Sequence, residues 1–169
     1  MRNLLVGNLI SAGASVFLAV SCVVNDKRKA YFCQLMESVL LVVSSVFFLA
    51  WVRLITQALA VGRNFLVMND KFTARLMWIF TIVGTAAGLW VNTEGWLGLM
   101  PIAGTIQLTL CNYYCKSLKA TKWGFLVNVL IWGVYSFLIW DIAYGLANVA
   151  IAIAGAVSLW RLEKTEHRR

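Results

Sequence analysis

The chain has 169 residues, of which 61% are hydrophobic and 13% are charged, and its mean hydropathy is +0.78. A soluble domain usually carries about 25% charged residues, so this composition excludes an ordinary soluble fold and indicates a helical membrane protein. The net charge of +8 lies mainly in short stretches between apolar segments. That distribution predicts contact with the anionic headgroups of a lipid bilayer and no nucleic-acid partner.

Seven apolar segments have about the length of a membrane-spanning helix, which needs roughly 20 residues. In chain order they are 4–24, 30–49, 51–68, 75–92, 96–115, 123–140 and 142–161. Short polar stretches separate most of the segments, Ala50 alone separates the second from the third, and a charged tail, 162–169, follows the last one. We therefore predict an all-α membrane protein with seven transmembrane helices in a single membrane domain, and a tail that is helical only at its start.

The charges between the segments divide by side of the membrane. One side collects 13 of the 15 basic residues: Lys27, Arg28, Lys29, Arg63, Lys71, Arg75, Lys116, Lys119, Lys122, Arg161, Lys164, Arg168 and Arg169. The other side has Arg2, the acidic turn at Asp141, and Arg53 just inside a helix. Because basic loops face the cytoplasm, we predict that the N-terminus is outside and the C-terminus is cytoplasmic.

The sequence also contains a weak internal repeat. A shift of 91 residues superimposes the first three segments on the last three without a gap, so that Glu37 falls on Asn128 and Gln57 falls on Asn148. The fourth segment is left over as a linker, which two three-helix units pointing the same way require. We predict a 3+1+3 arrangement of parallel repeats with these bounds: 4–68 for the first repeat, 75–92 for the linker helix and 96–161 for the second repeat.

Several short motifs carry a resemblance to a known family: Gly7-Asn8-Leu9-Ile10-Ser11, the loop Asn25–Lys29, Gln34 and Arg63-Asn64. With these motifs the chain resembles the YgjV-like bacterial inner-membrane proteins. Its 3+1+3 plan resembles the MtN3-like group of SWEET sugar facilitators, PQ-loop transporters and PnuC-type vitamin transporters. The resemblance implies a multi-pass protein of the bacterial inner membrane that passes a small metabolite between two triple-helix bundles.

The resemblance also implies a site on the third and seventh helices, where SWEET-like proteins present a facing pair of amides. Gln57 and Asn148 match that pair by position. The proline–glutamine pair of the group is absent, because Pro101 is followed by Ile102 and the first segment has no proline. Proline removes a backbone hydrogen bond from a helix, so a deformable point is predicted in the fifth helix alone.

Polar residues inside the segments also predict a site when they are considered without the resemblance, because such groups usually face the interior of a bundle. Arg53, Gln57 and Asn64 fall on one face of the third helix. Glu37 lies roughly 10 Å deep at 1.5 Å per residue. A carboxylate at that depth needs a partner, water or a proton; a structural hydrogen bond to Gln34 or to the first helix is the alternative.

The sixth helix adds Asn128, Trp132 and Tyr135 on one stripe, and their aromatic faces suit stacking on a ring. Ordinary helix packing is the alternative for this stripe, and interhelical hydrogen bonding is the alternative for the amides. We predict a substrate site formed by Glu37, Gln57, Asn128 and Asn148, with Arg53, Trp132 and Tyr135 as second choices.

These residues predict a facilitator, or a proton-coupled transporter, for a polar or ring-bearing small molecule such as a vitamin, nucleoside or sugar. A binding or scaffold protein that does not transport is the alternative. No nucleophile–base set is visible and His167 is the sole histidine, so we expect no enzyme activity, metal or cofactor. Gly84 and Gly88 form a GxxxG pattern that either docks the linker helix or joins the protomers of a homo-oligomer.

Overall fold

The computed structural model describes residues 2–24, 27–115 and 118–166. In this part of the chain the regular structure is helical throughout, and the seven predicted helices are confirmed. They are α1 (Arg2–Val23), α2 (Lys27–Phe48), α3 (Trp51–Met68), α4 (Ala74–Trp90), α5 (Leu99–Tyr114), α6 (Leu118–Leu138) and α7 (Ile142–Glu166). Lys116, Arg168, Arg169 and the predicted tail beyond Glu166 lie outside the described residues.

Helix α7 continues past the predicted span 142–161 to Glu166, in agreement with the prediction that the tail is helical at its start. Most residues in this added stretch are good helix formers. The ammonium of Lys164 also lies 5.4 Å from the centre of the Trp160 ring, one turn earlier, which is a favourable cation–π distance. The start of the predicted tail is therefore a continuation of the helix.

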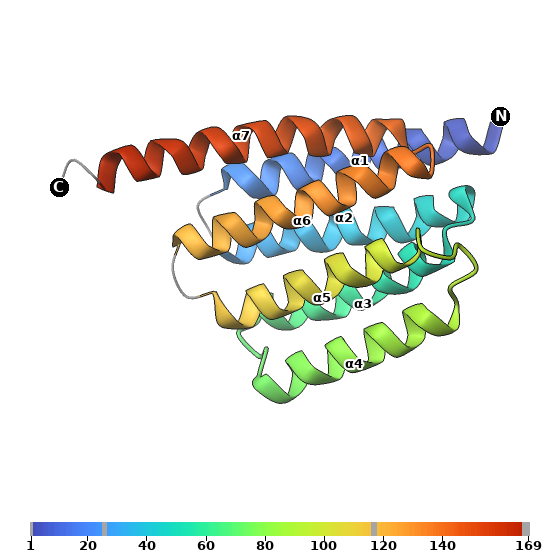
Figure 1. Ribbon diagram of the computed structural model, residues 1–169, viewed down its shortest axis with the longest axis horizontal. Coiled ribbons are helices and arrows are strands. Elements are labelled where there is room, and N and C mark those ends of the chain that lie inside the picture. Colours follow the sequence, from blue (N-terminus) through green and yellow to red (C-terminus); the bar gives the residue numbers. More distant parts are fainter. Residues whose placement is uncertain (1, 25–26, 116–117, 167–169) are drawn as a thin grey trace.

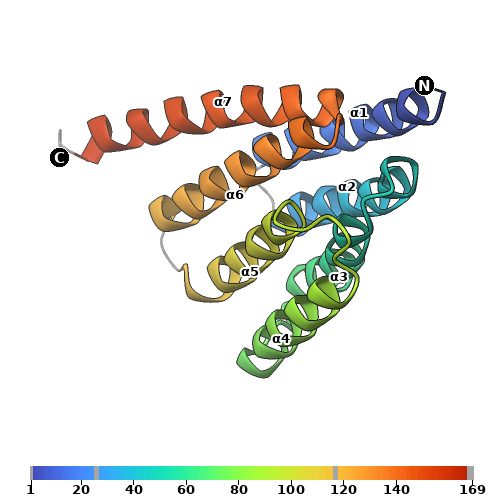
Figure 2. The same cartoon turned by 45° about the vertical axis from the view of Figure 1, so that its right-hand side comes forward.

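Six of the helices form a closed ring (Figures 1 and 2). Helix α1 packs on α2, α2 on α3, α3 on α5, α5 on α6, α6 on α7, and α7 on α1. Helix α4 lies outside the ring against α3 and α5. The start of α1 and the α2–α3, α4–α5 and α6–α7 connections lie at one end of the bundle, which we call the N-terminal end. The α3–α4 turn and the last turn of α7 lie at the opposite, C-terminal end.

Helix α4 docks through its GxxxG pattern. A Cβ atom on Gly88 would lie 2.7 Å from Cγ1 of Ile102 in α5, and a Cβ atom on Gly84 would lie 3.4 Å from Cδ1 of Leu59 in α3. Hydrogen in place of a side chain permits this close approach. The pattern therefore packs the linker helix within the chain, which is the first of the two roles left open by the sequence.

Pro101 does not interrupt a helix. It is the third residue of α5, which begins at Leu99, and the first N–H groups of a helix have no intrahelical partner in any case. The prediction of a deformable point in the fifth helix was wrong, because this helix begins at Leu99, three residues later than the predicted start at residue 96.

Two tight turns at the N-terminal end have the same geometry. Leu49 in the α2–α3 turn and Trp140 in the α6–α7 turn have positive φ angles of 55° and 64°. The N–H group of the next residue donates to the carbonyl oxygen five residues before it. The N···O distance is 3.0 Å from Ala50 to Ser45 and 2.9 Å from Asp141 to Ser136. This is the Schellman motif that often ends a helix. The two turns are 91 residues apart, which is the spacing of the predicted repeat.

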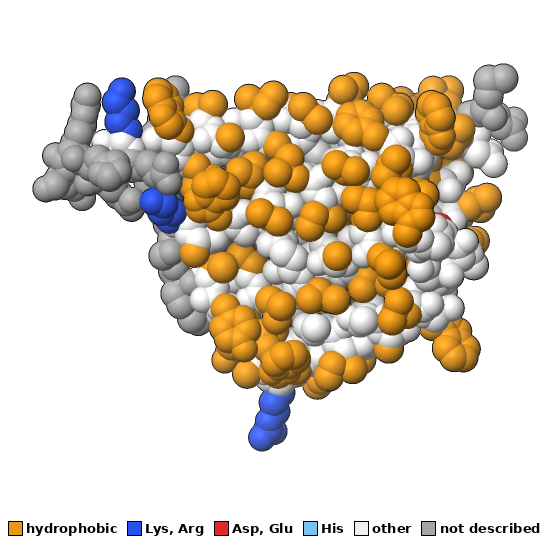
Figure 3. All heavy atoms as spheres, in the orientation of Figure 1, with side chains coloured by type: hydrophobic (Ala, Val, Ile, Leu, Met, Phe, Trp, Pro, Cys, Tyr) orange, Lys and Arg blue, Asp and Glu red, His pale blue; other side chains and the backbone are white. Residues whose placement is uncertain are grey.

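The outer surface of the bundle is largely apolar on the face that Figure 3 presents, whereas basic side chains gather towards the C-terminal end. Exposed tryptophans lie near both ends of the helices: Trp51, Trp90, Trp96 and Trp140 at the N-terminal end, and Trp78, Trp123 and Trp160 towards the C-terminal end. Tryptophan favours the two interfaces of a membrane with water.

Two segments are long and apolar enough to cross a membrane by length and composition. They are Asn3–Ser21 in α1 and Arg28–Phe48 in α2. Shorter apolar stretches lie in α4, α6 and α7, at Ala74–Trp90, Lys122–Leu138 and Ile142–Val157.

Candidate functional site

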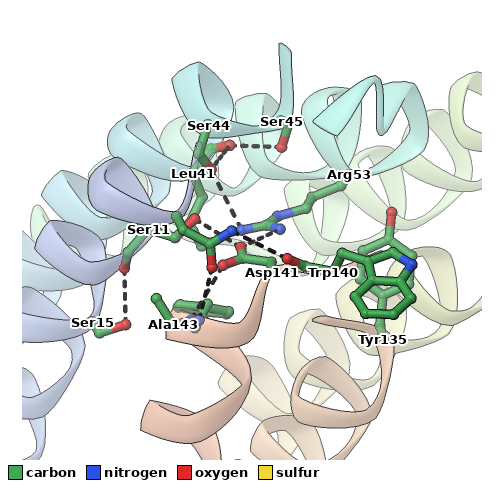
Figure 4. A network of polar contacts seen from close by, with 12 residues as sticks. Ser11, Ser15, Leu41, Ser44, Ser45, Arg53, Tyr135, Trp140, Asp141 and Ala143 are labelled. Atoms are coloured by element: carbon green, nitrogen blue, oxygen red, sulfur yellow. Dashed lines mark hydrogen bonds and ion pairs between the residues drawn. The ribbon is translucent and has the colours of Figure 1, made fainter. Parts of the chain in front are cut away.

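A buried ion pair lies at the N-terminal end of the ring (Figure 4). Nη1 of Arg53 in α3 donates to Oδ2 of Asp141 in the α6–α7 turn at 2.7 Å, and both side chains are 0% exposed. Ser11 in α1 donates to the same carboxylate oxygen at 2.7 Å. Nη2 of Arg53 lies 3.5 Å from the hydroxyl of Ser44 in α2. We call Arg53, Asp141, Ser11 and Ser44 the end network; it ties α1, α2 and α3 to the opposite half of the ring.

The end network also holds the start of α7. The other carboxylate oxygen of Asp141 accepts from the N–H of Tyr144 at 3.2 Å, so Asp141 acts as an N-cap. Asn8 accepts from the N–H of Ala143 at 3.0 Å and donates to the carbonyl of Trp140 at 3.1 Å. The polar face of α1 is therefore engaged in packing against the α6–α7 turn.

A cavity lies at the centre of the ring, and residues of all six ring helices line it. The empty space between its walls is about 500 Å³, with open solvent at its edge included. Five of the seven predicted site residues line it: Glu37, Gln57, Asn128, Trp132 and Asn148. The structure thus brings together side chains from α2, α3, α6 and α7.

The other two predicted residues lie elsewhere. Arg53 belongs to the end network. Tyr135 is 0% exposed, and its hydroxyl donates to Oε2 of Glu94 in the α4–α5 connection at 3.0 Å. Its ring meets Trp132 edge to face, with centroids 5.9 Å apart. Both residues are second choices of the sequence prediction, and the structure gives each a partner within the chain.

The lining of the cavity repeats along the chain. Four pairs of lining residues are separated by 91 positions: Gln34 and Phe125, Glu37 and Asn128, Ser38 and Val129, and Gln57 and Asn148. Arg53 and Tyr144 are also 91 positions apart, and the guanidinium carbon of Arg53 lies 5.4 Å from the centre of the Tyr144 ring. Residues at matching positions in the two halves of the ring therefore line the same cavity.

Glu37 has a partner on the far side of the cavity. Its carboxylate accepts a hydrogen bond from the hydroxyl of Tyr144 in α7, rather than from Gln34 or α1 as the alternative prediction had it. Glu37 is 7% exposed. Because the Tyr144 ring also lies beside Arg53, this tyrosine contacts both the cavity and the end network.

The three cavity amides differ in how much of their hydrogen-bonding capacity is used. Asn128 donates to the carbonyl of Gly104 at 2.7 Å and to Oε1 of Gln107 at 3.0 Å, so it joins α6 to α5. Asn148 donates to a carbonyl in its own helix, but its buried Oδ1 has no partner among the described residues. The Gln57 amide has no hydrogen-bond partner in the described part of the chain. Gln57 and Asn148 are therefore available to a ligand.

Arg63 is the functional candidate that sequence reasoning missed. The charge pattern along the sequence groups it with the loop charges, but the structure places it inside α3, 3% exposed and lining the cavity. Its Nη1 donates to Thr109 at 3.0 Å, while Nε and Nη2 share Oδ1 of Asn64 at 3.3 Å. The available signal was its position within the predicted span 51–68, since a charge inside a span is a candidate site residue.

An apolar exterior around a buried, partly charged cavity defines an all-helical bundle of the kind that resides in membranes. Within residues 2–24, 27–115 and 118–166, no group of three or more His, Cys, Asp or Glu residues is arranged to hold a metal ion.

The family model Imp-YgjV, described as bacterial inner membrane protein, matches residues 5–166. The chain therefore belongs to this family of bacterial inner membrane proteins, and the predicted resemblance to it is confirmed. No curated protein and no solved structure matches the chain.

Proposed function

We propose that this protein is a transporter of the bacterial inner membrane that moves a small polar or ring-bearing metabolite through the ring of six helices. One observation carries the proposal. The central cavity is lined by residues from both predicted repeats at matching positions, and two of them, Gln57 and Asn148, keep unused hydrogen-bonding capacity. Transporters built from parallel repeats bind their substrates between the repeats, and the resemblance of the 3+1+3 plan to SWEET-like and PnuC-type proteins supports the same arrangement.

In this proposal all seven helices span the membrane, with the N-terminal end outside. Trp140 and Trp160 flank the apolar part of α7, and 20 residues of helix measure about 30 Å, the thickness of the hydrocarbon core. Exposed basic residues such as Arg75 and Lys164 lie at the C-terminal end, as expected for the cytoplasmic side. A green fluorescent protein fused to the C-terminus should fluoresce; an active alkaline phosphatase at the same position would overturn this orientation.

The end network then lies between the cavity and the outside. Arg53 is the third residue of α3, and Gln57 follows one turn further in. Asp141 precedes α7, and Asn148 lies seven residues further along. Transport requires the end network to separate, so that the cavity opens to the outside while its other end closes.

Uptake into liposomes that contain the purified protein tests the proposal. The panel comprises labelled vitamins, nucleosides, sugars and amino acids, and we expect uptake of at least one class. The double variant Gln57→Ala/Asn148→Ala should lower that uptake at least tenfold, whereas Asn3→Ala, which removes an exposed amide in α1, should leave it unchanged. Undiminished uptake by a well-folded double variant would overturn the proposed site. Absence of uptake across the panel would favour the non-transporting scaffold.

A further inference from the structure

Two opposite charges face the same cavity from neighbouring helices. Glu37 in α2 lies 12 residues before Leu49, and Arg63 in α3 lies 13 residues after Ala50, on the two sides of the tight α2–α3 turn. Because the two helices run antiparallel from this turn, equal distances along them place the two charges at the same depth, roughly 18–20 Å from the turn.

Glu37 and Arg63 are not paired with each other in the described structure. The carboxylate accepts from the Tyr144 hydroxyl, and the guanidinium donates to Thr109 and Asn64, all of which are neutral groups. A guanidinium has five N–H donors, so this arginine keeps donors unused in the described part of the chain. The two groups are near enough to attract each other across the cavity, but no direct ion pair compensates the cost of burying them. A ligand that carries both opposite charges would bind each group directly and bridge the space between them.

The charges are confined to one half of the cavity. The positions 91 residues after Glu37 and Arg63 carry Asn128 and Ala154, which are neutral. The second half supplies aromatic walls instead, from Phe125 and Trp132 of α6. The cavity is therefore polarised, with a charged side on α2 and α3 and an apolar, aromatic side on α6.

We propose that the ligand is a small zwitterion that carries a carboxylate, an amine and an apolar or aromatic body, as an aromatic amino acid does. Arg63 binds the carboxylate, which its planar fork fits. Glu37 binds the ammonium, and the unpartnered Oδ1 of Asn148 accepts one of its hydrogens. The ring lies against Phe125 and Trp132. This inference rests on the proposed function in that it assigns the ligand of the same cavity.

Ligand-induced thermal stabilisation of the purified full-length protein tests the assignment, since a ligand that binds only the folded state raises the melting temperature. The probes are L-phenylalanine, phenethylamine, which lacks the carboxylate, and 3-phenylpropionate, which lacks the amine. Glucose and uridine serve as neutral compounds. We expect L-phenylalanine to bind at least tenfold more tightly than either truncated compound, and both neutral compounds to bind more weakly still.

Two variants assign the two charges. Arg63→Gln should weaken the binding of L-phenylalanine at least tenfold and leave the binding of phenethylamine unaffected. Glu37→Gln should also weaken the binding of L-phenylalanine at least tenfold, but it should leave the binding of 3-phenylpropionate unaffected. Arg75→Gln is the matched control, because Arg75 is an exposed arginine at the start of α4. If Arg63→Gln does not fold, Arg63→Lys keeps the charge but loses the fork, and should still weaken binding of the carboxylate.

The outcomes separate this inference from the proposed function. Equal affinity for the three phenyl compounds, or binding that is indifferent to Arg63, would overturn the zwitterion. Binding of glucose or uridine without L-phenylalanine, with uptake that depends on Gln57 and Asn148, would also overturn it while leaving the transporter intact. Absence of both binding and uptake in a folded protein would overturn both.

Discussion

Two polar clusters lie inside the same ring of helices, and they differ in how far their hydrogen bonds are completed by the chain. In the end network the Asp141 carboxylate accepts from Arg53, Ser11 and the backbone N–H of Tyr144, while Nε of Arg53 has no partner among the described residues. In the cavity Glu37 and Arg63 form hydrogen bonds to neutral groups only, and the amide of Gln57 has no hydrogen-bond partner in the described residues. The comparison suggests that the first cluster holds helices together and that the second is available to a ligand.

Tyr144 connects the two clusters. Its hydroxyl donates to Glu37, and its ring lies 5.4 Å from the guanidinium carbon of Arg53. A ligand that binds Glu37 competes for the hydrogen bond from this tyrosine. Ligand binding in the cavity can therefore alter, through Tyr144, the surroundings of the ion pair that lies between the cavity and the N-terminal end. This contact gives the transport proposal a physical route between substrate binding and opening.

The largest expected effect comes from breaking the end network. Asp141→Ala leaves the buried Arg53 guanidinium without its counter-charge, and loss of one partner of a buried ion pair typically costs about 3–5 kcal/mol. Thermal unfolding in detergent should show this loss. Asp70→Asn, at an exposed acid in the α3–α4 turn, is the control. An Asp141→Ala protein as stable as the control would show that the ion pair does not hold the ring together.

Removal of both charges sharpens the same point. In Arg53→Met/Asp141→Leu neither side chain leaves an uncompensated buried charge, and such replacements are often neutral or stabilising in other proteins. The lost N-cap, which contributes about 1 kcal/mol, is common to both variants, so we expect the double variant to unfold at a higher temperature than Asp141→Ala. A double variant that is less stable than the single one would mean that the two charges act independently.

A smaller effect is expected at the connection between the clusters. Tyr144→Phe removes the hydrogen bond to Glu37 but keeps the ring beside Arg53, and a hydrogen bond to a charged group contributes about 1.5–3 kcal/mol. Tyr144→Leu removes the ring as well and should destabilise further. Chemical unfolding of the two variants under the same conditions measures their free energies of unfolding and checks this order. Equal stability of Tyr144→Phe and the unaltered protein would contradict the claim that the hydrogen bond to Glu37 links the two clusters.

The smallest effect on stability is expected in the cavity. Gln57→Leu/Asn148→Leu replaces amides that have little or no bonding to the rest of the chain and removes an unpartnered buried oxygen. We expect the free energy of unfolding to change by less than about 1 kcal/mol, while uptake is lost. A loss of stability as large as that of Asp141→Ala would place these amides in the structural cluster.

The sequence was sufficient for the helices because each is a long apolar run bounded by polar residues, and for the pairing of Gln57 with Asn148 because a constant offset relates them. It was insufficient for Asp141, which follows Trp140 in a tight turn and has the pattern of an exposed loop acid. The backbone turns this carboxylate inward, towards a partner 88 positions away. Arg63 was misplaced for a related reason, since a charge count along the chain does not distinguish the end of a helix from its buried face.

Thiol labelling at positions 57 and 148 tests the central claim most directly. Single cysteines at these positions, in a background without the native cysteines, are exposed to a membrane-impermeant thiol reagent from outside in spheroplasts and from inside in inverted vesicles. A cysteine at position 44, in the end network, is the control. We predict labelling at 57 and 148 from both sides and protection at 44 from the cytoplasmic side. Complete protection at 57 and 148 from both sides would contradict the account, because the cavity amides would then lie in a packed interior that no substrate enters.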